Sequence, residues 1–556
     1  MSTPLFLERL FDWRRSGRGV PALLLAALAA LFLLAFANLH LWHASWQVLA
    51  AQQSGATLLL LAVALWLIFT AILYLLLWPV IGKPLLMLVF VCAALAAYAM
   101  DAYGTYIDVN MVGNLMATDW REVYGLLSWE LLQYVLLLGV VPSLLLAWLP
   151  IRHARWSLQL LFKPLVFVLA LLLAGGLLLT DYQQASALGR NHRELRYLIN
   201  PWMPFYYGYA YFREQAQDEQ PFKVIGQDAH LGAPLVDAKK PTLVLLVVGE
   251  TARAQDFSLD GYGRDTNPEL AKRQVFSFRQ VQSCGTETAV SLPCMFSPYE
   301  RKDYSREKAL HTSNLLDVLK QAGVTVLWRD NNSGSKGMAD RVSYEDVSRS
   351  DDPAVCAKDR EHCYDGVLLY RLPAWLQQQQ AAKPGTNLLV VLHMYGSHGP
   401  AYYKRYPAAF ARFQPECKTN ELSRCAQQDI VNSYDNTILY TDHVLAQMID
   451  FLKQQSGYNT ALLYLSDHGE SLGEDGLYLH GMPWHLAPEQ QRHIPFIWWM
   501  SEDYAGHMGL SASCLQRRLD TPLSQDDLFS SVLGMFAVRT QVYDPTLDFL
   551  APCRTP

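Results

Sequence analysis

The sequence lacks the clustered basic residues that nucleic-acid binding requires, and its few charged residues are unevenly distributed. The 556 residues carry a formal net charge of −6, which leaves no basic surface for a phosphate backbone. Charged side chains make up 17% of the chain and apolar ones 51%, a composition that excludes intrinsic disorder. The first 180 residues hold 16 charged side chains, whereas the remaining 376 hold 80. The sequence therefore predicts an apolar anchor followed by a water-exposed part.

Five long apolar stretches fill the first part of the chain. Each approaches or exceeds the roughly 20 residues that an α-helix needs to cross a bilayer. Because a soluble core rarely buries five such stretches in succession, we interpret residues 1–180 as a transmembrane domain with five spans. The spans are expected at about 21–40, 56–80, 84–100, 128–150 and 160–180.

Positive charges predict the orientation of this domain. Lys and Arg precede the first span and lie between spans two and three and between spans four and five. The two remaining connections contain Arg121 as their one basic residue. Because positively charged loops stay in the cytoplasm, we expect a cytoplasmic N-terminus and a translocated C-terminal part. Three arginines just after the last span oppose this rule, which long translocated domains follow weakly (Arg190, Arg193 and Arg196).

Cysteine is almost absent from the first part, where Cys92 lies within a span. The other eight cysteines all follow residue 180, and none of their spacings is the C-x₂-C of a thiolate zinc site. An even number in pairs predicts disulfides in an oxidising compartment, which here is the periplasm. The expected pairs are Cys284/Cys294, Cys356/Cys363, Cys417/Cys425 and the more widely spaced Cys514/Cys553.

Two segments outside the spans have a distinctive pattern. Residues 181–235 form a bridge rich in aromatic residues, which suits either the headgroup level of a membrane or packing on the soluble part. In the loop 101–127, three polar residues follow one another at helical spacing: Asn114, Thr118 and Glu122. The spacing by itself is typical of a solvated helix face.

Residues 236–556 show the alternation of an α/β domain. Short apolar runs follow one another from residue 241, as in PTLVLLVV, GVTVLW, TNLLVVLH, TALLYLS and IPFIWW. Such runs are typical of strands covered on both faces, and amphipathic helical segments separate them. The pattern predicts an α/β/α sandwich around a largely parallel sheet, with its ligand site beyond the carboxyl ends of the strands.

Four of these strands run into polar residues that bind metals or phosphate. Taken singly, each of these residues could have a purely structural role, since Glu250 could cap a helix and a single histidine is usually a surface group. Together, carboxylates and imidazoles at one sheet edge are a ligand set for zinc. The residues concerned are Glu250, Asn332, Lys336, His393, His398, Asp467, His468 and, farther along, His480.

Threonine hydroxyls lie in the motif SCGTETA at 283–289. A threonine hydroxyl is a poor nucleophile at neutral pH unless a base or a metal activates it. The expected Cys284–Cys294 disulfide would hold this loop rigid, as a nucleophile requires. From these residues alone, however, a simple turn is the favoured interpretation.

The chain resembles the phosphoethanolamine transferases that modify lipid A, including the mobile colistin-resistance enzymes, over nearly its whole length. The sulfatase signature C-x-P-x-R is absent around Cys284, which disfavours a sulfatase. The motifs that carry the resemblance are GETAR at 249–253, SCGTETAVSLPCMFS at 283–297, WRDNNSGSKG at 328–337, HGPAYYKRYP at 398–407, YDNTILYTD at 434–442 and SDHGESLGE at 466–474.

The resemblance implies a fold and a set of roles. The fold is an N-terminal five-helix transmembrane bundle followed by a periplasmic domain of alkaline-phosphatase/sulfatase type. Thr288 is the implied nucleophile, and it would share one tightly bound Zn²⁺ with Glu250, Asp467 and His468. His398 and His480 would contact the phosphoryl group or a second zinc. The implied substrate contacts are Asn332 and Lys336 on the phosphate oxygens and Asn114, Thr118 and Glu122 on the ethanolamine side.

The implied reaction takes phosphoethanolamine from phosphatidylethanolamine onto Thr288 and passes it to a lipid A phosphate. The enzyme would lie in the inner membrane of a Gram-negative bacterium, act as a monomer on membrane lipids, and confer polymyxin resistance. Three alternatives stay open: another envelope acceptor (core-sugar heptose or a periplasmic glucan), a metal-dependent phosphodiesterase, and a catalytically silent membrane sensor or scaffold.

Overall fold

The computed structural model describes residues 19–51, 55–118, 123, 126–216, 221–236, 238–352, 354–356 and 363–555. The chain divides into two compact units. Unit 1 consists of Met1–Val109 and Leu127–Ala210, and unit 2 consists of Asn110–Leu126 and Tyr211–Pro556. The α6 segment thus belongs to unit 2 although its sequence lies between two transmembrane helices.

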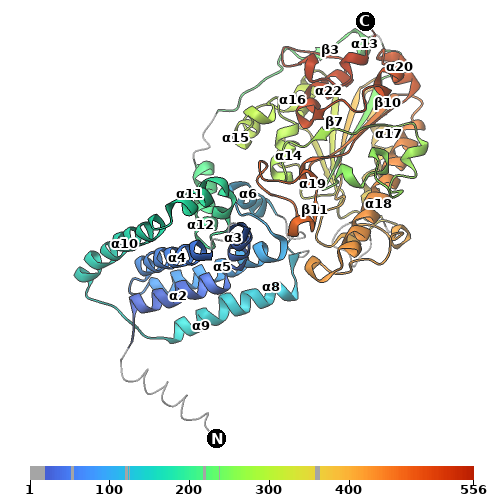
Figure 1. The fold of residues 1–556 in the computed structure, drawn as a ribbon. Coiled ribbons are helices and arrows are strands. Elements are labelled where there is room, and N and C mark those ends of the chain that lie inside the picture. Colours follow the sequence, from blue (N-terminus) through green and yellow to red (C-terminus); the bar gives the residue numbers. More distant parts are fainter. Residues whose placement is uncertain are drawn as a thin grey trace. The chain divides into compact units, whose positions relative to one another are not determined.

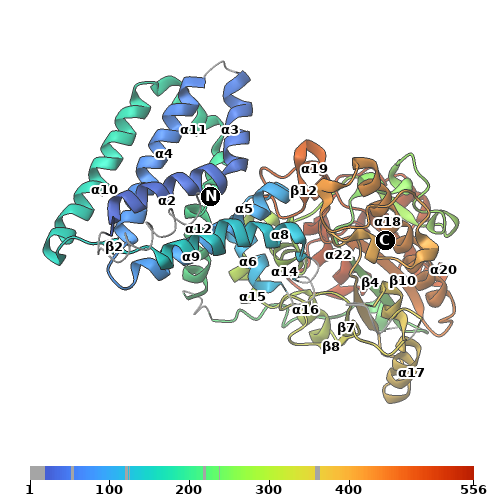
Figure 2. The same cartoon turned by 90° about the horizontal axis from the view of Figure 1, so that it is seen from below.

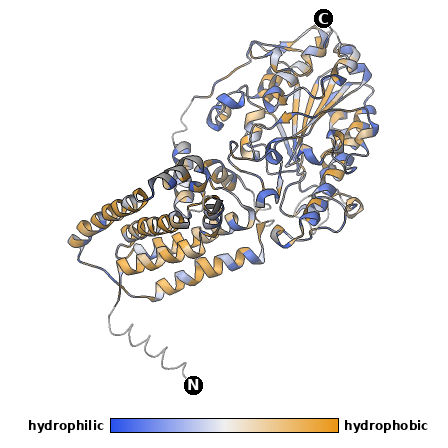
Figure 3. Ribbon diagram, viewed as in Figure 1, coloured by the Kyte–Doolittle hydropathy of each residue, from blue (hydrophilic) through white to orange (hydrophobic). Residues whose placement is uncertain are grey.

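Unit 1 is a bundle of apolar helices (Figures 1 and 3). Among the described residues, four helices are long and apolar enough to cross a membrane, and a fifth candidate is the pair α2 and α3, which is bent by 65°. Helix α4 packs against both α2 and α10 (Figure 2). The bounds are α2 Ala22–Phe36, α3 Leu39–Ala51, α4 Gly55–Leu76, α5 Gly82–Tyr103, a continuous helix Trp129–Trp148 formed by α8, η1 and α9, and α10 Trp156–Leu179.

The first expected span differs from a single straight helix. Helix α2 has 15 residues, or about 22 Å at 1.5 Å per residue, which is shorter than the hydrocarbon core. The chain bends at Ala37 and Asn38, where the Asn200 side chain donates to the Ala37 carbonyl and the Asn38 side chain donates to the carbonyls of Leu33 and Asn200. These buried amides satisfy backbone groups freed by the break, as an apolar surrounding requires.

The bridge folds as helices. It comprises α11 Tyr182–Asn191, the 3₁₀ helix η2 Arg193–Leu198 and α12 Trp202–Ala216. Trp202 and Phe205 pack against the apolar core of unit 1, and the Trp202 ring lies edge-on to Phe69 with centroids 5.7 Å apart. These two aromatic residues therefore pack on the helices of unit 1 and not on the soluble part, while the expected headgroup level stays a prediction.

Unit 2 is built on a seven-stranded sheet in the order β5-β13-β10-β4-β9-β7-β8. Strands β10, β4, β9, β7 and β8 are parallel, and β13 pairs antiparallel with both β10 and the edge strand β5. The expected sheet is therefore confirmed. The bounds are β4 Thr242–Gly249, β5 Phe276–Phe278, β7 Thr325–Asp330, β8 Ser343–Asp346, β9 Leu388–His393, β10 Asn459–Ser466 and β13 Phe496–Met500.

Two apolar cores cover the two faces of this sheet. Val244, Leu246 and Val248 of β4 pack with α16 (Leu315–Gln321) and α22 (Leu528–Met535), whereas the alternate residues of β4 pack with α17 (Leu372–Ala382) and α18 (Gln427–Lys453). Figure 1 shows these helix pairs on opposite sides of the strands. Because both faces are buried, the strands are continuous apolar runs instead of alternating ones.

All four expected disulfides are present in unit 2. They join Cys284 to Cys294, Cys356 to Cys363, Cys417 to Cys425 and Cys514 to Cys553. Cys92 of α5 is a free thiol. The pairing agrees with the expected oxidising compartment.

Candidate functional site

The register of the sheet brings the predicted ligands to one edge. Gly249 at the end of β4 pairs with Ser466 at the end of β10, so Glu250 and Asp467 leave adjacent strands at the same level. His393 pairs with Val248 on the other side of β4, and Asp330 of β7 pairs with His393. This edge lies at the carboxyl ends of the parallel strands, where α/β sheets bind their ligands.

Glu250, Asp467 and His468 converge on one buried point. Their ligand atoms all lie within 4.8 Å of one another, and each side chain is fully buried. His468 Nε2 is 3.4 Å from Glu250 Oε1 and 3.3 Å from Asp467 Oδ2. The Thr288 hydroxyl lies 3.1 and 3.2 Å from the two Glu250 oxygens and 3.4 Å from His468 Nε2. Four residues predicted from three separate motifs thus form one cluster.

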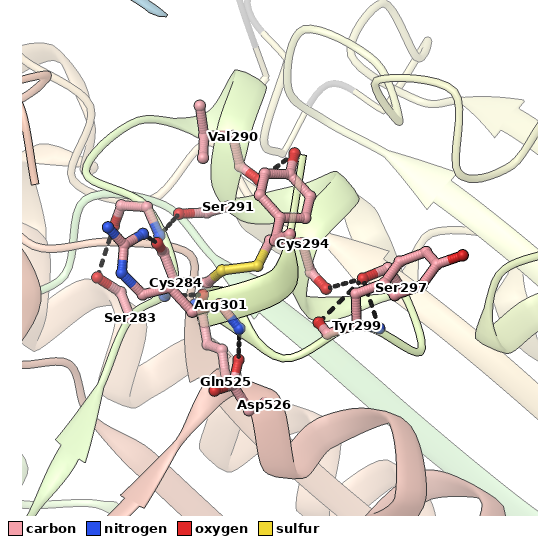
Figure 4. Close-up of a disulfide and its surroundings, with 12 residues drawn as sticks. Ser283, Cys284, Val290, Ser291, Cys294, Ser297, Tyr299, Arg301, Gln525 and Asp526 are labelled. Carbon is pink, nitrogen blue, oxygen red and sulfur yellow. Dashed lines mark hydrogen bonds between the residues drawn. A yellow bond between two sulfur atoms is a disulfide. The ribbon is translucent and has the colours of Figure 1, made fainter. Parts of the chain in front are cut away.

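Thr288 lies where a disulfide-bonded loop meets the start of a helix. It is the first residue of α14 (Thr288–Met295), so its hydroxyl lies at the positive end of the helix dipole. The Cys284–Cys294 disulfide ties the preceding loop to the far end of this helix (Figure 4). The Gly285 amide also donates to the Ser291 hydroxyl. The loop is therefore held on both sides of Thr288.

Gln525 connects the loop before Thr288 to the end of β10, and no motif in the sequence indicated this residue. Its side-chain oxygen accepts from the Cys284 amide at 2.7 Å (Figure 4), while its nitrogen donates to the carbonyls of Ser466 and Asp467 at 2.9 and 2.7 Å. Gln525 is completely buried. Because it lies about 50 residues beyond the last motif, which ends at residue 474, and at a helix start, no local pattern could identify it.

Electrostatics set the protonation of the cluster. Burial opposes charge on His468, but Asp467 and Glu250 raise its pKa to about 10. Burial and the Glu250 charge raise the pKa of Asp467 to about 6. Burial likewise favours neutral Glu250, but its hydrogen bond and attraction to His468 hold the pKa of Glu250 below its usual range. The two carboxyl groups therefore depend on a positive charge between them, which protonated His468 supplies.

The same donor set fits a divalent cation. Asp467 Oδ2 is buried and has no hydrogen-bond partner among the described residues, and it is 3.3 Å from His468 Nε2. Two carboxylates and one imidazole match the ligand preferences of zinc. Within the described ranges a second candidate group comprises Cys284, Cys294 and Asp526, but its sulfurs are joined in a disulfide. Glu250, Asp467 and His468 are therefore the candidate metal centre.

His398 and His480 lie beside this centre. The His480 ring centroid is 4.4 Å from that of His468 and 5.7 Å from that of His398. His480 Nδ1 is 2.8 Å from Glu470 Oε2, and the other Glu470 oxygen accepts from Tyr402. Burial lowers the pKa of His398 to about 3, so this imidazole is neutral at physiological pH. The three rings form one imidazole surface next to Thr288.

Asn332 and Lys336 follow β7, as predicted, but both point to protein groups here. The Asn332 amide donates to Glu250 Oε2 at 2.7 Å and to the Met394 carbonyl at 2.8 Å. Lys336 Nζ donates to the hydroxyl and carbonyl of Ser333, at 2.8 and 3.1 Å. Asn332 thus orients a candidate metal ligand in this structure.

Asp330 and His393 form a buried pair beneath Asn332. His393 Nδ1 is 3.0 Å from Asp330 Oδ2, and His393 Nε2 is 3.3 Å from the Asn332 side chain. His393 is among the candidate ligands predicted from the sequence, and Asp330 lies in the motif WRDNNSGSKG, but the sequence indicates no individual role for either residue. Through Asn332, this pair helps to orient Glu250, and hydrogen bonds that orient a ligand in this way are typical of metal sites.

The polar stripe of the loop 101–127 is partly described. Asn114 and Thr118 lie in and just after α6 (Val109–Ala117), both half-buried, and the Thr118 hydroxyl donates to the Asn114 carbonyl. The Met111 methyl lies 2.8 Å from the point where a Cβ on Gly481 would stand, so α6 packs next to the His480 segment within unit 2. Glu122 lies outside the described residues.

Comparison with known proteins gives a broad class, which the fold and the candidate metal centre support. A family model described as "Sulfatase" matches residues 242–538, which agrees with an α/β domain whose metal site lies at the strand ends. A second model, "Phosphoethanolamine transferase EptA/EptB", matches residues 65–216. The two matches cover most of the apolar helices of unit 1, from within α4 onward, and the α/β domain of unit 2.

Individual relatives identify the family. The phosphoethanolamine transferase EptA of Escherichia coli K12 is 40% identical over 85% of this chain and 86% of its own length. The phosphatidylethanolamine transferase Mcr-1 of E. coli is 38% identical over 95% and 96%. The integral membrane protein lipooligosaccharide phosphoethanolamine transferase A from Neisseria meningitidis superimposes with a TM-score of 0.92 at 32% identity, over 97% of this chain and 99% of the other. The chain belongs to the phosphoethanolamine transferase family.

Proposed function

We propose that the protein moves phosphoethanolamine from phosphatidylethanolamine to a phosphate of lipid A through a phosphothreonine at Thr288. The observation that carries this proposal is the convergence of the Thr288 hydroxyl with Glu250, Asp467 and His468 at one buried point. A hydroxyl in such a position serves covalent catalysis, since a threonine with no base or metal beside it is inert. The family membership supplies the class of group transferred.

Glu250, Asp467 and His468, with Thr288 as a fourth ligand, would hold one Zn²⁺. When bound, zinc supplies a Lewis acid that lowers the pKa of the threonine hydroxyl and offsets charge on the phosphoryl oxygens. The chain itself prepares the hydroxyl, which donates toward the Glu250 carboxylate at 3.1 Å. Asn332 fixes that carboxylate by donating to the same oxygen, Oε2, at 2.7 Å.

In the first half-reaction the Thr288 oxygen attacks the phosphorus of the donor lipid. A new Thr288 Oγ1–P bond forms while the bond from phosphorus to the diacylglycerol oxygen breaks. The threonine proton leaves to the carboxylate cluster, and the departing diacylglycerol oxygen needs a proton. His480 is placed to supply it, because Glu470 holds its Nδ1 and leaves Nε2 for the leaving group. His398, neutral in this structure, would accept a hydrogen bond or bind a second zinc.

In the second half-reaction a phosphate oxygen of lipid A attacks the phosphothreonine. A new P–O–P bond forms while the P–Oγ1 bond breaks, and the threonine oxygen regains its proton. The acceptor phosphate becomes a diphosphate whose outer phosphate carries the ethanolamine. Thr288 is 7% exposed, so the intermediate would be shielded from water. Shielding of this kind favours transfer to the acceptor over hydrolysis by water. A phosphodiesterase would need that hydrolysis, so the shielding argues against this alternative.

Substrate contacts complete the proposal. Lys336 would turn from Ser333 to a phosphate oxygen, and Asn332 is close enough to share in that contact. Asn114 and Thr118, next to the His480 segment, would bind the ethanolamine together with Glu122. Acidic or amide side chains suit this group because its ammonium carries a positive charge.

We further propose an inner-membrane location in a Gram-negative bacterium, with a cytoplasmic N-terminus, a periplasmic unit 2 and a monomeric state. The four disulfides support the compartment. Each phosphoethanolamine adds an ammonium group to an anionic lipid A phosphate. The modified surface then attracts cationic polymyxins less strongly, so the activity would confer colistin resistance.

Mass spectrometry of lipid A from cells that express the full chain tests this proposal. The wild type and a surface control, Thr546→Ala, should add the mass of phosphoethanolamine to lipid A, and Thr288→Ala should not. Addition by Thr288→Ala would exclude the nucleophile. Modification of the core sugars or a glucan in place of lipid A would overturn the acceptor and leave the transferase. Zinc content of the purified variants, reduced in Glu250→Gln and retained in Thr546→Ala, tests the metal centre separately.

A further inference from the structure

Unit 1 contains a cavity that the proposed reaction does not use. It has a volume of about 320 Å³ and lies among α3, α4, α11 and η2, with Leu178 of α10 as a further wall. Leu61 and Leu65 of α4 and Leu188 of α11 line its apolar side. All proposed catalytic and metal-binding residues are in unit 2, so the cavity is a separate feature.

A buried hydroxyl inside this cavity has no partner. Ser45 of α3 is fully buried, lines the cavity, and its Oγ forms no hydrogen bond to any described residue. Leaving such a group unsatisfied is unfavourable, and native structures usually supply a partner. An occupant with a polar atom at this depth would supply the missing bond.

Basic residues line the same cavity, and two acidic residues contact residues of its lining. Arg196 and His192 belong to its lining. Arg196 is exposed and donates to the Tyr197 hydroxyl, and His192 is 3.0 Å from Glu194. Thr57, another lining residue, donates to Asp181. An anionic phosphate suits Arg196, while an ammonium suits Asp181 or Glu194.

The lining suits a hydrocarbon chain next to this polar group. Thr57, Leu61 and Leu65 follow one another at intervals of four residues, so the apolar stripe extends from the polar end along α4. A Cβ on Gly189 would meet no atom within 4 Å, which shows that the cavity is open on the α11 side. The volume is at the low end of the range for small-ligand sites, about 300–1,000 Å³. It admits one chain and not the several chains of lipid A.

We propose that this cavity binds one acyl chain of a membrane glycerophospholipid, with the phosphate of a zwitterionic ethanolamine headgroup at Arg196 and its ammonium at the neighbouring carboxylates. The lipid would be a resident ligand of unit 1, held apart from catalysis. This inference does not rest on the proposed reaction, because Thr288→Ala is expected to bind the lipid as the wild type does.

Photocrosslinking of the full chain in detergent tests the proposal. The probe is a phosphatidylethanolamine with a diazirine in its acyl chain, added in small molar excess, and crosslinked peptides are mapped by mass spectrometry. We expect crosslinks in residues 39–51, 55–76 and 182–199. Leu61→Trp and Gly189→Leu, which fill the cavity from opposite walls, should each reduce these crosslinks about tenfold or more. Leu59→Trp makes the same change on a side chain of α4 that is 66% exposed, and it should leave them unchanged.

The headgroup is tested by competition and by one further variant. Unlabelled dioleoylphosphatidylethanolamine should displace the probe at about tenfold lower concentration than dioleoylphosphatidylglycerol or lipid A, and Arg196→Gln should remove this preference. Unchanged crosslinking in both Leu61→Trp and Gly189→Leu would overturn the cavity as the site. Equal displacement by all three lipids would overturn the zwitterionic assignment, and stronger displacement by lipid A would overturn the glycerophospholipid.

Discussion

Gly396 is the position where one methyl group should disable the metal centre. It lies in the turn after β9 with φ of +53°, and both its amide and that of Tyr395 donate to Asp365 at 2.8 Å. A Cβ there would stand 2.6 Å from the Glu250 carbonyl oxygen, 3.0 Å from its nitrogen and 3.1 Å from its Cβ. Gly396→Ala therefore pushes directly on the backbone of a candidate zinc ligand.

The magnitude follows from two separate effects. Alanine in a left-handed conformation costs about 1–2 kcal/mol wherever it occurs. Real Cβ atoms essentially never approach within 3.0 Å, so Glu250 must also move by about 0.4 Å or more. Catalytic groups tolerate only about 0.5 Å, and a 1 Å misplacement costs about a hundredfold in rate. We expect Gly396→Ala to lower transferase activity about tenfold to a hundredfold and to weaken zinc retention.

Gly385→Ala is the matched control. Gly385 has φ of +79°, but a Cβ there would meet nothing within 4 Å. It should lose similar stability from backbone strain while keeping its zinc and its activity. Phosphoethanolamine transfer, zinc content and thermal unfolding of both full-length variants measure the three effects. Equal activity in the two variants would refute the argument that Gly396 acts through Glu250.

Two further predictions concern residues away from the nucleophile. Gln525→Leu should destabilise the protein by about 2–5 kcal/mol and lower activity, because it leaves the Cys284 amide and two buried carbonyls without partners. Thermal unfolding measures the loss of stability against Gln428→Leu, a control at an exposed position. Equal destabilisation by the two substitutions would contradict the prediction. Burial raises the pKa of Asp260 to about 7, so the folded state keeps a proton that the unfolded state has lost. Stability from this group should therefore fall as pH rises from about 4 to 7, and the melting temperature of Asp260→Asn relative to wild type should be higher at pH 8 than at pH 5; a difference independent of pH would exclude this effect.

The sequence predicted the sheet and the metal cluster because both are encoded by local patterns. A strand buried on both faces must be a continuous apolar run, and the residue after it is placed by the sheet. Glu250, Asp467 and His468 could thus be assigned to one edge, and the four cysteine pairs followed from their spacing and compartment. The motif resemblance then added Thr288, whose short distance to Glu250 no spacing could give.

The features that the sequence did not predict depend on contacts between distant segments. Gln525 reaches Cys284 across 241 residues, and the bend at Asn38 is stabilised by Asn200 from 162 residues away. Neither residue alters the hydropathy pattern around it, so the first span appeared as one straight helix. Polar side chains that satisfy buried backbone groups are visible only once the chain has folded.

The nucleophile and the metal ligands are held by different means, and this difference can be tested. The ligands Glu250, Asp467 and His468 leave strands of the central sheet, whereas Thr288 depends on a loop fixed by the Cys284–Cys294 disulfide and Gln525. Replacing both cysteines with serine removes a constraint that spans ten residues and costs about 2–3 kcal/mol of stability. We expect this double variant to retain zinc while losing most of its transferase activity.

The control is the double serine variant at Cys417 and Cys425. The disulfide that it removes closes a loop of similar length just before α18. It should lose comparable stability while keeping both zinc and activity, because its loop contains none of the residues that hold Thr288. Zinc analysis and a transfer assay on the two purified full-length variants separate the cases. Loss of zinc together with activity in the Cys284/Cys294 variant would mean that the loop supports the metal ligands as well, and the division between a sheet-held metal and a disulfide-held nucleophile would then be wrong.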